Sequence, residues 1–194
     1  MVDSVAAARF NWIDVVVICL ILITTYNGTR RSFIIEFFKT IGVLASIYVS
    51  LHYFSRISGF FNENFPNIKY PFLDLFFFLA LAEVTYLLIV LVRGLLAKLL
   101  KVEAASILDK WGGLFLGFFR GILLTSLLIF LMYISAVPYL EKSPRKSYLG
   151  NRLVLVDTNI YKFIFYGIVS KFSPEEKINP AIDEVIAKNT EAKL

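Results

Sequence analysis

The stretch DKWGGLFLGFFRG, residues 109–121, limits the kind of fold that this chain can adopt. Its glycines, Gly113, Gly117 and Gly121, recur every four residues, so on a helix they form one smooth stripe. Asp109 and Arg120 fall on the same side of that helix, at about 100° per residue. The phenylalanine side chains point the other way. Such a helix is typical of a bilayer, where the glycine face meets another helix and the rings meet lipid.

The composition of the whole chain supports a membrane protein. Hydrophobic residues make up 58% of the 194 residues and charged residues only 18%, whereas a soluble domain carries roughly 45–50% apolar and about 25% charged residues. We therefore predict an all-α polytopic membrane protein with the lipid bilayer as its first partner. The net charge of +5 would suit nucleic acid, but the basic residues cluster at the ends of apolar segments, where membrane topology places them. We expect no nucleic-acid partner.

The hydropathy pattern predicts a four-span helical bundle over residues 1–137, followed by a basic, partly interfacial tail over 138–194. The spans are expected at about residues 12–26, 33–54, 72–92 and 111–137. No small-x-small cleavage site follows the first segment, so it is expected to be an uncleaved span rather than a signal peptide.

The segments between and after the spans also carry predictions. Residues 95–110 alternate lysine with leucine and predict an amphipathic connector on the membrane surface, while residues 55–71 predict an irregular loop. The fourth span is longer than a ~30 Å hydrocarbon core, and Gly112-Gly113 is the expected place for a break. Residues 160–172 are expected to be interfacial or packed on the bundle. A short polar helix is expected after Asn179-Pro180. Lysine and arginine in the first and third loops favour both termini outside.

Ionisable side chains at bilayer depth are candidates for function. Glu83 and Arg120 lie at similar depths on the third and fourth spans, so we predict a pair between them, with Tyr86 one turn away. Three interpretations stay open: a structural ion pair, a polar path for a proton, ion or small solute, and two groups that never meet. Glu36 and Lys39 are expected to be interfacial.

The glycine stripe has two possible partners, a helix of the same chain or a second copy in a homo-oligomer. The sequence carries no enzyme signature, so we expect no catalytic residues, no metal and no cofactor. Cys19 and His52 occur once each and are expected to pack rather than react.

Three motifs in a fixed order carry a family resemblance. The first is Asn11-Trp12-Ile13-Asp14, the second is NGTRRSF at residues 27–33, and the third is Leu108-Asp109 followed by the glycine stripe. The second motif contains Gly28, Arg30 and Arg31. Over roughly residues 10–140 the chain resembles the colicin V production protein family of CvpA-like membrane proteins. That family's hairpin has a second glycine where this chain has Ser32.

The resemblance implies a multi-pass protein of the bacterial inner (plasma) membrane with four spans. It further implies a role in colicin V (toxin) production or secretion and in envelope homeostasis, with export or envelope proteins as partners. It defines no catalytic residues. Two hypotheses follow: a channel or transporter component, and a non-transporting scaffold that recruits partners through its C-terminal tail.

Overall fold

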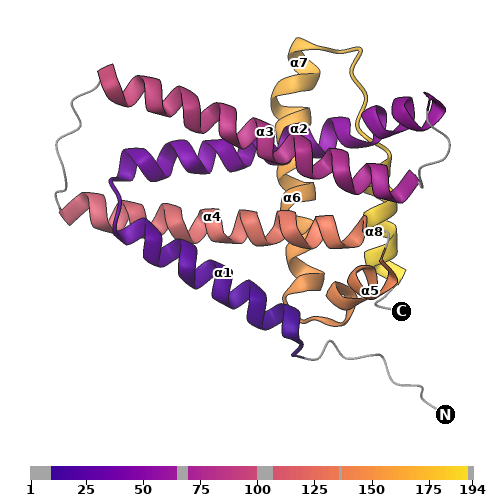
Figure 1. Ribbon diagram of the computed structural model, residues 1–194, viewed down its shortest axis with the longest axis horizontal. Helices are drawn as coiled ribbons and strands as arrows, with labels where there is room; N and C mark the ends of the chain where they lie inside the picture. Colours follow the sequence, from indigo (N-terminus) through magenta and orange to yellow (C-terminus); the bar gives the residue numbers. More distant parts are fainter. Residues whose placement is uncertain (1–9, 65–69, 100–106, 136, 192–194) are drawn as a thin grey trace.

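The structure is a computed structural model that describes residues 10–64, 70–99, 107–135 and 137–191. Over these ranges the chain is helical and forms no strand, which confirms the all-α expectation. Four long helices run alongside one another (Figure 1): α1 (Trp12–Thr29), α2 (Phe33–Asn64), α3 (Tyr70–Leu99) and α4 (Ile107–Tyr133).

The four long helices pack as two pairs that meet along α2 and α4. α1 packs mainly on α4, α3 packs mainly on α2, and α2 contacts α4, whereas the backbones of α3 and α4 approach at few places. Apolar residues of α2 and α4 fill the centre of the bundle, among them Val43, Ile47, Leu51, Leu123 and Phe130. Phe54, Phe78 and Phe130 pack with edge-to-face and stacked rings that join α2, α3 and α4. The lateral order is therefore α3–α2–α4–α1.

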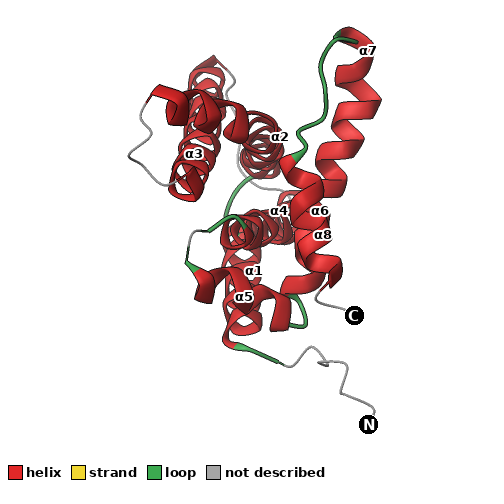
Figure 2. Cartoon of the chain, turned by 90° about the vertical axis from the view of Figure 1, so that its right-hand side faces the viewer, coloured by secondary structure: helices red, strands yellow, loops and turns green. Residues whose placement is uncertain are grey.

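The C-terminal part of the chain wraps around one end of this bundle. It contains α5 (Pro138–Lys146), α6 (Gly150–Ile164), a π-helical turn η1 (Phe165–Val169), α7 (Ser170–Phe172) and α8 (Ala181–Glu191). The continuous stretch from α6 to α7 lies across the direction of the four long helices (Figures 1 and 2). One face of α6 is buried against α4 and α2 through Val154, Asp157 and Tyr161.

Five helices are long and apolar enough to cross a membrane, one more than the sequence predicts. The additional candidate, Gly150–Phe172, is the stretch that crosses the bundle. A helix lying across the other four cannot cross the same bilayer in the same direction as they do. The all-helical membrane class is thus supported by five candidate spans, and the count of four stays a prediction.

Several predicted boundaries are wrong. The predicted loop over residues 55–71 is helical as far as Asn64, because Ser58 and Arg56 are held by contacts from other elements. α4 is one unbroken α-helix through Gly112-Gly113, and it ends at Tyr133 rather than at residue 137. The predicted connector is divided among α3, α4 and residues 100–106, which lie outside the described residues.

The prediction of a short C-terminal helix is confirmed by α8. Asn179 Oδ1 accepts a hydrogen bond from the backbone N–H of Ala181, at 3.1 Å. This side chain therefore satisfies one of the free N–H groups at the start of α8, as expected of an N-cap residue.

Candidate functional site

The glycine stripe of α4 is covered by α1 of the same chain. A Cβ atom on Gly113 would meet the backbone oxygen of Gly28, and one on Gly117 would lie 2.7 Å from the backbone oxygen of Thr24. One on Gly121 would lie 3.0 Å from the Cα atom of Ile21. Real Cβ atoms essentially never come within 3.0 Å of another heavy atom. The two backbones therefore touch along the whole stripe, as small residues at four-residue spacing allow.

Arg120 projects from α4 toward α2 and forms an ion pair with Glu36. Its Nη1 atom lies 2.6 Å from Glu36 Oε2, and Lys39 Nζ lies 3.1 Å from Glu36 Oε1. The exposed fractions of the three side chains are 6% for Arg120, 10% for Lys39 and 0% for Glu36. We call these residues the α2–α4 charge cluster. Glu36 and Lys39 are buried in it, and their predicted depth at the membrane interface stays a prediction.

The predicted pair between Glu83 and Arg120 does not form. Ser46 Oγ donates to the backbone oxygen of Ala82, and the Tyr86 ring packs on Gly42, so this face of α3 meets α2. Glu83 is rotated by about 100° from Ala82 and is exposed. α3 packs mainly on α2 and meets α4 through the rings of Phe78 and Phe130, away from Glu83. Tyr86 consequently lies on the α2–α3 interface and is no third member of the Arg120 cluster.

The charge cluster carries one positive charge in excess, because two cations share one carboxylate. Arg120 Nε is buried and has no hydrogen-bond partner among the residues that the structure describes. A guanidinium has five N–H donors and an ammonium has three, so the cluster holds more donors than Glu36 can accept. Its chemistry is that of a site able to attract an anionic group or water.

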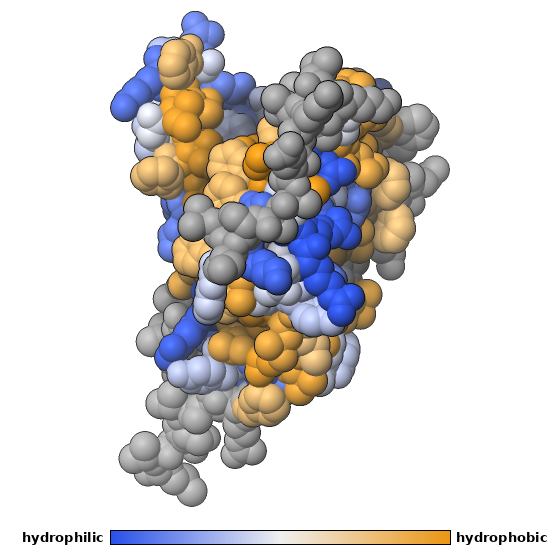
Figure 3. All heavy atoms as spheres, turned by 90° about the vertical axis from the view of Figure 1, so that its left-hand side faces the viewer, coloured by the Kyte–Doolittle hydropathy of each residue, from blue (hydrophilic) through white to orange (hydrophobic). Residues whose placement is uncertain are grey.

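The cluster lies near the end of the bundle formed by the α1–α2 hairpin and the start of α4. Seen from that end, hydrophilic side chains gather between apolar ones (Figure 3). Arg31 is exposed there. Arg30 folds back over the Tyr26 ring, 4.4 Å from its centroid. This end is therefore strongly basic.

Asp14 ties the opposite end of the bundle together. It is fully buried, and its Oδ1 accepts hydrogen bonds of 2.7 Å from Ser147 Oγ and from the backbone N–H of Leu149. Its Oδ2 accepts one of 2.7 Å from the backbone N–H of Asn11, which completes a capping box at the start of α1. Asp14 thus joins α1 to the turn between α5 and α6.

The other motif residues also occupy structural positions at helix ends. Trp12 stacks on Tyr139 of α5, with ring centroids 6.3 Å apart. Asp109 Oδ1 accepts a hydrogen bond of 3.3 Å from the backbone N–H of Phe33 and so links the start of α4 to the start of α2. The sequence motifs therefore mark places where helices are joined.

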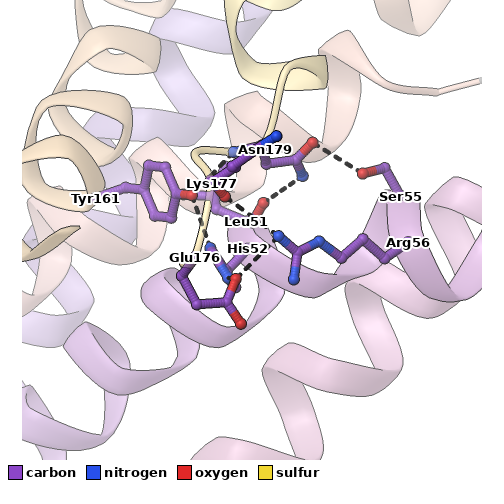
Figure 4. A network of polar contacts seen from close by, with 8 residues as sticks. All are labelled: Leu51, His52, Ser55, Arg56, Tyr161, Glu176, Lys177 and Asn179. Carbon is purple, nitrogen blue, oxygen red and sulfur yellow. Dashed lines mark hydrogen bonds and ion pairs between the residues drawn. The ribbon is translucent and has the colours of Figure 1, made fainter. Parts of the chain in front are cut away.

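A second polar network holds the segment before α8 against α2 (Figure 4). His52 is buried, with Nδ1 2.8 Å from Tyr161 Oη and Nε2 3.2 Å from Glu176 Oε2. Arg56 Nη2 lies 3.0 Å from the same Glu176 oxygen. The hydrogen bond from Arg56 lowers the pKa of Glu176 below its ordinary value, so this carboxylate contributes to stability at neutral pH and loses that contribution only when the pH falls through the lowered pKa.

Asn179 is the centre of the same network. Its Nδ2 donates to the backbone oxygen of Leu51 at 2.6 Å, and its Oδ1 accepts from Ser55 Oγ at 2.8 Å. Its backbone N–H donates to Tyr161 Oη at 3.2 Å. The expectation that His52 packs is confirmed, and both of its ring nitrogens are hydrogen-bonded.

Replacing Asn179 with alanine is expected to lower the free energy of unfolding by about 1–2 kcal/mol, because the backbone oxygen of Leu51 loses its partner in the protein interior. The segment before α8 should then be cut faster by a protease in detergent solution. Glu175→Ala, at an exposed position nearby, is the control and should leave the cleavage rate unchanged. Equal cleavage of the Asn179→Ala and parent proteins would contradict this role.

Comparisons with known proteins assign the family. The family model for "Colicin V production protein" matches residues 13–156. This match covers α1 to α4 and α5 and ends within α6, so it includes both partners of the Arg120 ion pair and the Asp14 anchor. Neither the comparison with curated proteins nor that with solved structures finds a match. Because the family model matches well over half of the chain, this membrane protein belongs to the colicin V production protein family.

Proposed function

We propose that the protein supports colicin V production or secretion from the bacterial inner membrane as a component of a channel or transporter. The observation that carries this proposal is the α2–α4 charge cluster, in which Glu36, Lys39 and Arg120 are buried together. Charged side chains inside a membrane domain are costly, and those retained there commonly line a path for ions or solutes.

The net positive charge of the α2–α4 charge cluster favours a path for an anionic species. Two cations share one carboxylate, and Arg30 and Arg31 add positive charge at the adjacent end of the bundle. A cleft or seam lined by one sign of charge raises the local concentration of ions of the opposite sign. We expect the excess positive charge on Lys39, rather than the Glu36–Arg120 ion pair, to attract the moving species.

Removal of the Lys39 charge tests the proposal. Lys39→Met keeps the Glu36–Arg120 pair and a side chain of similar length, so we expect the protein to fold while anion flux falls at least about tenfold. Flux is measured with a chloride-sensitive dye in proteoliposomes that hold the full chain, and secretion is measured as the zone of growth inhibition around cells that make colicin V.

Two variants make the result interpretable. Lys39→Arg keeps the charge and should retain flux, and Lys110→Met removes an exposed lysine on α4 and should leave flux unchanged. Circular dichroism establishes that each variant is folded. A folded Lys39→Met protein with the parent's flux and inhibition zone would contradict the proposed transport role.

A scaffold that recruits partners is the second candidate, and one observation favours it. The stretch from α6 to α7 presents exposed aromatic side chains, which are enriched at protein interfaces: Phe163, Tyr166 and Phe172. Because the tail is packed into the bundle, deleting it would disturb the fold as well as any partner contact. Replacing these three residues with serine tests the partner contact without removing the tail. Loss of secretion with normal flux would favour the scaffold over the transporter component.

A further inference from the structure

A groove lies where the start of α1 meets α5, at the end of the bundle away from the α2–α4 charge cluster. It measures about 480 Å³, which is within the usual size range of small-molecule sites. Its lining combines aromatic, basic and small polar side chains: Asn11, Trp12, Pro138, Tyr139, Lys142, Ser143 and Lys146. We call it the α1–α5 groove.

The basic side chains of the groove are Lys142 and Lys146, one turn apart on α5 and both exposed. No carboxylate among the described residues forms a salt bridge with either ammonium group. The neighbouring Arg145 is different, because its Nη2 atom lies 2.7 Å from Glu141 Oε1. The groove therefore has a twofold positive charge and is complementary to a phosphate group.

The aromatic side chains place the groove at the level of the lipid headgroups. Trp12 and Tyr139 stack with an interplanar angle of 2°, and their exposed fractions are 41% and 66%. Tryptophan and tyrosine gather where the hydrocarbon of a membrane meets its headgroups, because each combines an apolar ring with a polar group. α1 begins at this level and continues away from it as an apolar helix.

An exposed apolar stripe continues from the groove along α1. Trp12, Val15, Cys19, Leu22 and Tyr26 follow one another at steps of three and four residues, and all are exposed. On a helix this spacing forms one face, about 21 Å long from first to last. A phosphate on the lysines would thus be followed by a surface suited to an acyl chain, which a free phosphate ion would not use.

We infer that the α1–α5 groove is a binding site for an anionic phospholipid. Lys142 and Lys146 bind the headgroup phosphate, the stacked rings of Trp12 and Tyr139 lie beside the glycerol, and an acyl chain lies along the exposed stripe of α1. The site lies apart from the charge cluster and does not depend on transport.

Fluorescence of Trp12 tests this site, because the chain has only two tryptophans. Trp111→Phe leaves Trp12 as the single tryptophan in an otherwise complete chain. We expect phosphatidylglycerol with brominated acyl chains to quench Trp12 at much lower lipid fractions than brominated phosphatidylcholine in mixed detergent micelles. Lys142→Gln with Lys146→Gln should reduce the preference for phosphatidylglycerol by about thirtyfold, since each lysine near an anionic headgroup contributes about a fivefold preference.

Controls distinguish a bound lipid from a bound soluble phosphate and from a general charge effect. Lys110→Gln with Lys171→Gln removes the same charge at exposed positions outside the groove and should keep the preference. Excess glycerol 3-phosphate should not relieve the quenching, and relief by it would overturn the assignment to lipid in favour of a soluble phosphate. Equal quenching by the two lipids, or an unchanged preference after both groove lysines are replaced in a folded protein, would also overturn the site.

Discussion

Arg120→Leu is expected to lower the free energy of unfolding by about 3–5 kcal/mol. Without the guanidinium, the fully buried Glu36 carboxylate keeps only Lys39 as a charged partner among the described residues. Removing one member of a buried ion pair leaves an uncompensated charge, which costs more than the pair itself contributes. Thermal or denaturant unfolding of the purified protein in mild detergent measures the change.

Two comparisons show whether the loss of stability comes from the Glu36 carboxylate that no longer pairs with Arg120. Adding Glu36→Gln to Arg120→Leu removes that charge and should recover a substantial part of the lost stability. Glu83→Gln lies on the exposed face of α3 and should change stability by less than about 0.5 kcal/mol. If Glu83→Gln were as damaging as Arg120→Leu, the pairing of Arg120 with Glu36 would be wrong.

Gly113→Ala is expected to lower stability by about 2–3 kcal/mol, because the added methyl group would press on the backbone oxygen of Gly28. A backbone atom cannot rotate away as a flexible side chain can, so α1 must move away from α4. The same substitution at Gly94, where the added methyl meets no described atom outside the adjacent helix backbone within 4 Å, should have the opposite sign and raise stability by about 0.5–1 kcal/mol.

Unfolding of the two alanine variants under identical detergent conditions checks this pair of predictions. The comparison is matched, because both glycines are helical and both receive the same side chain. A Gly113→Ala protein as stable as Gly94→Ala would show that α1 and α4 do not touch along the glycine stripe.

The sequence predicts the helical class and most of the bundle because those features depend on local patterns. Apolar length predicts the cores of α1 to α4, and four-residue glycine spacing predicts that α4 closely approaches another helix. Neither signal says which helix that partner is. Chain order makes α3 the natural neighbour of α4, whereas in the structure α3 packs mainly on α2 and α1 covers the glycines.

The same limit explains why the sequence predicts the wrong partner for Arg120. Depth along a helix can be counted from the sequence, and Glu83 matches Arg120 by that measure. The length of an arginine side chain lets Arg120 reach Glu36 near the start of α2 instead, and only the lateral packing of the helices decides between the two. One sequence feature does point to the observed cluster. Glu36 and Lys39 are three residues apart, which places a carboxylate beside an ammonium on one helical face.

The helix that crosses the bundle has a consequence for the order in which this protein is made. Ribosomes release the chain from its first residue onward, and the apolar helices α1 to α4 leave well before α6 and the segment up to Asn179. Until those late residues arrive, Asp14 lacks the hydrogen bonds from Ser147 and Leu149, and His52 lacks those to Tyr161 and Glu176.

A newly inserted chain therefore passes through a stage in which its long helices are in place and their buried polar groups are unmatched. Such a stage is vulnerable to membrane proteases and to mispairing with other chains. Completion of the C-terminal segment ends it by supplying the missing partners. That segment thus acts within the molecule like a late-arriving subunit that binds helices made before it.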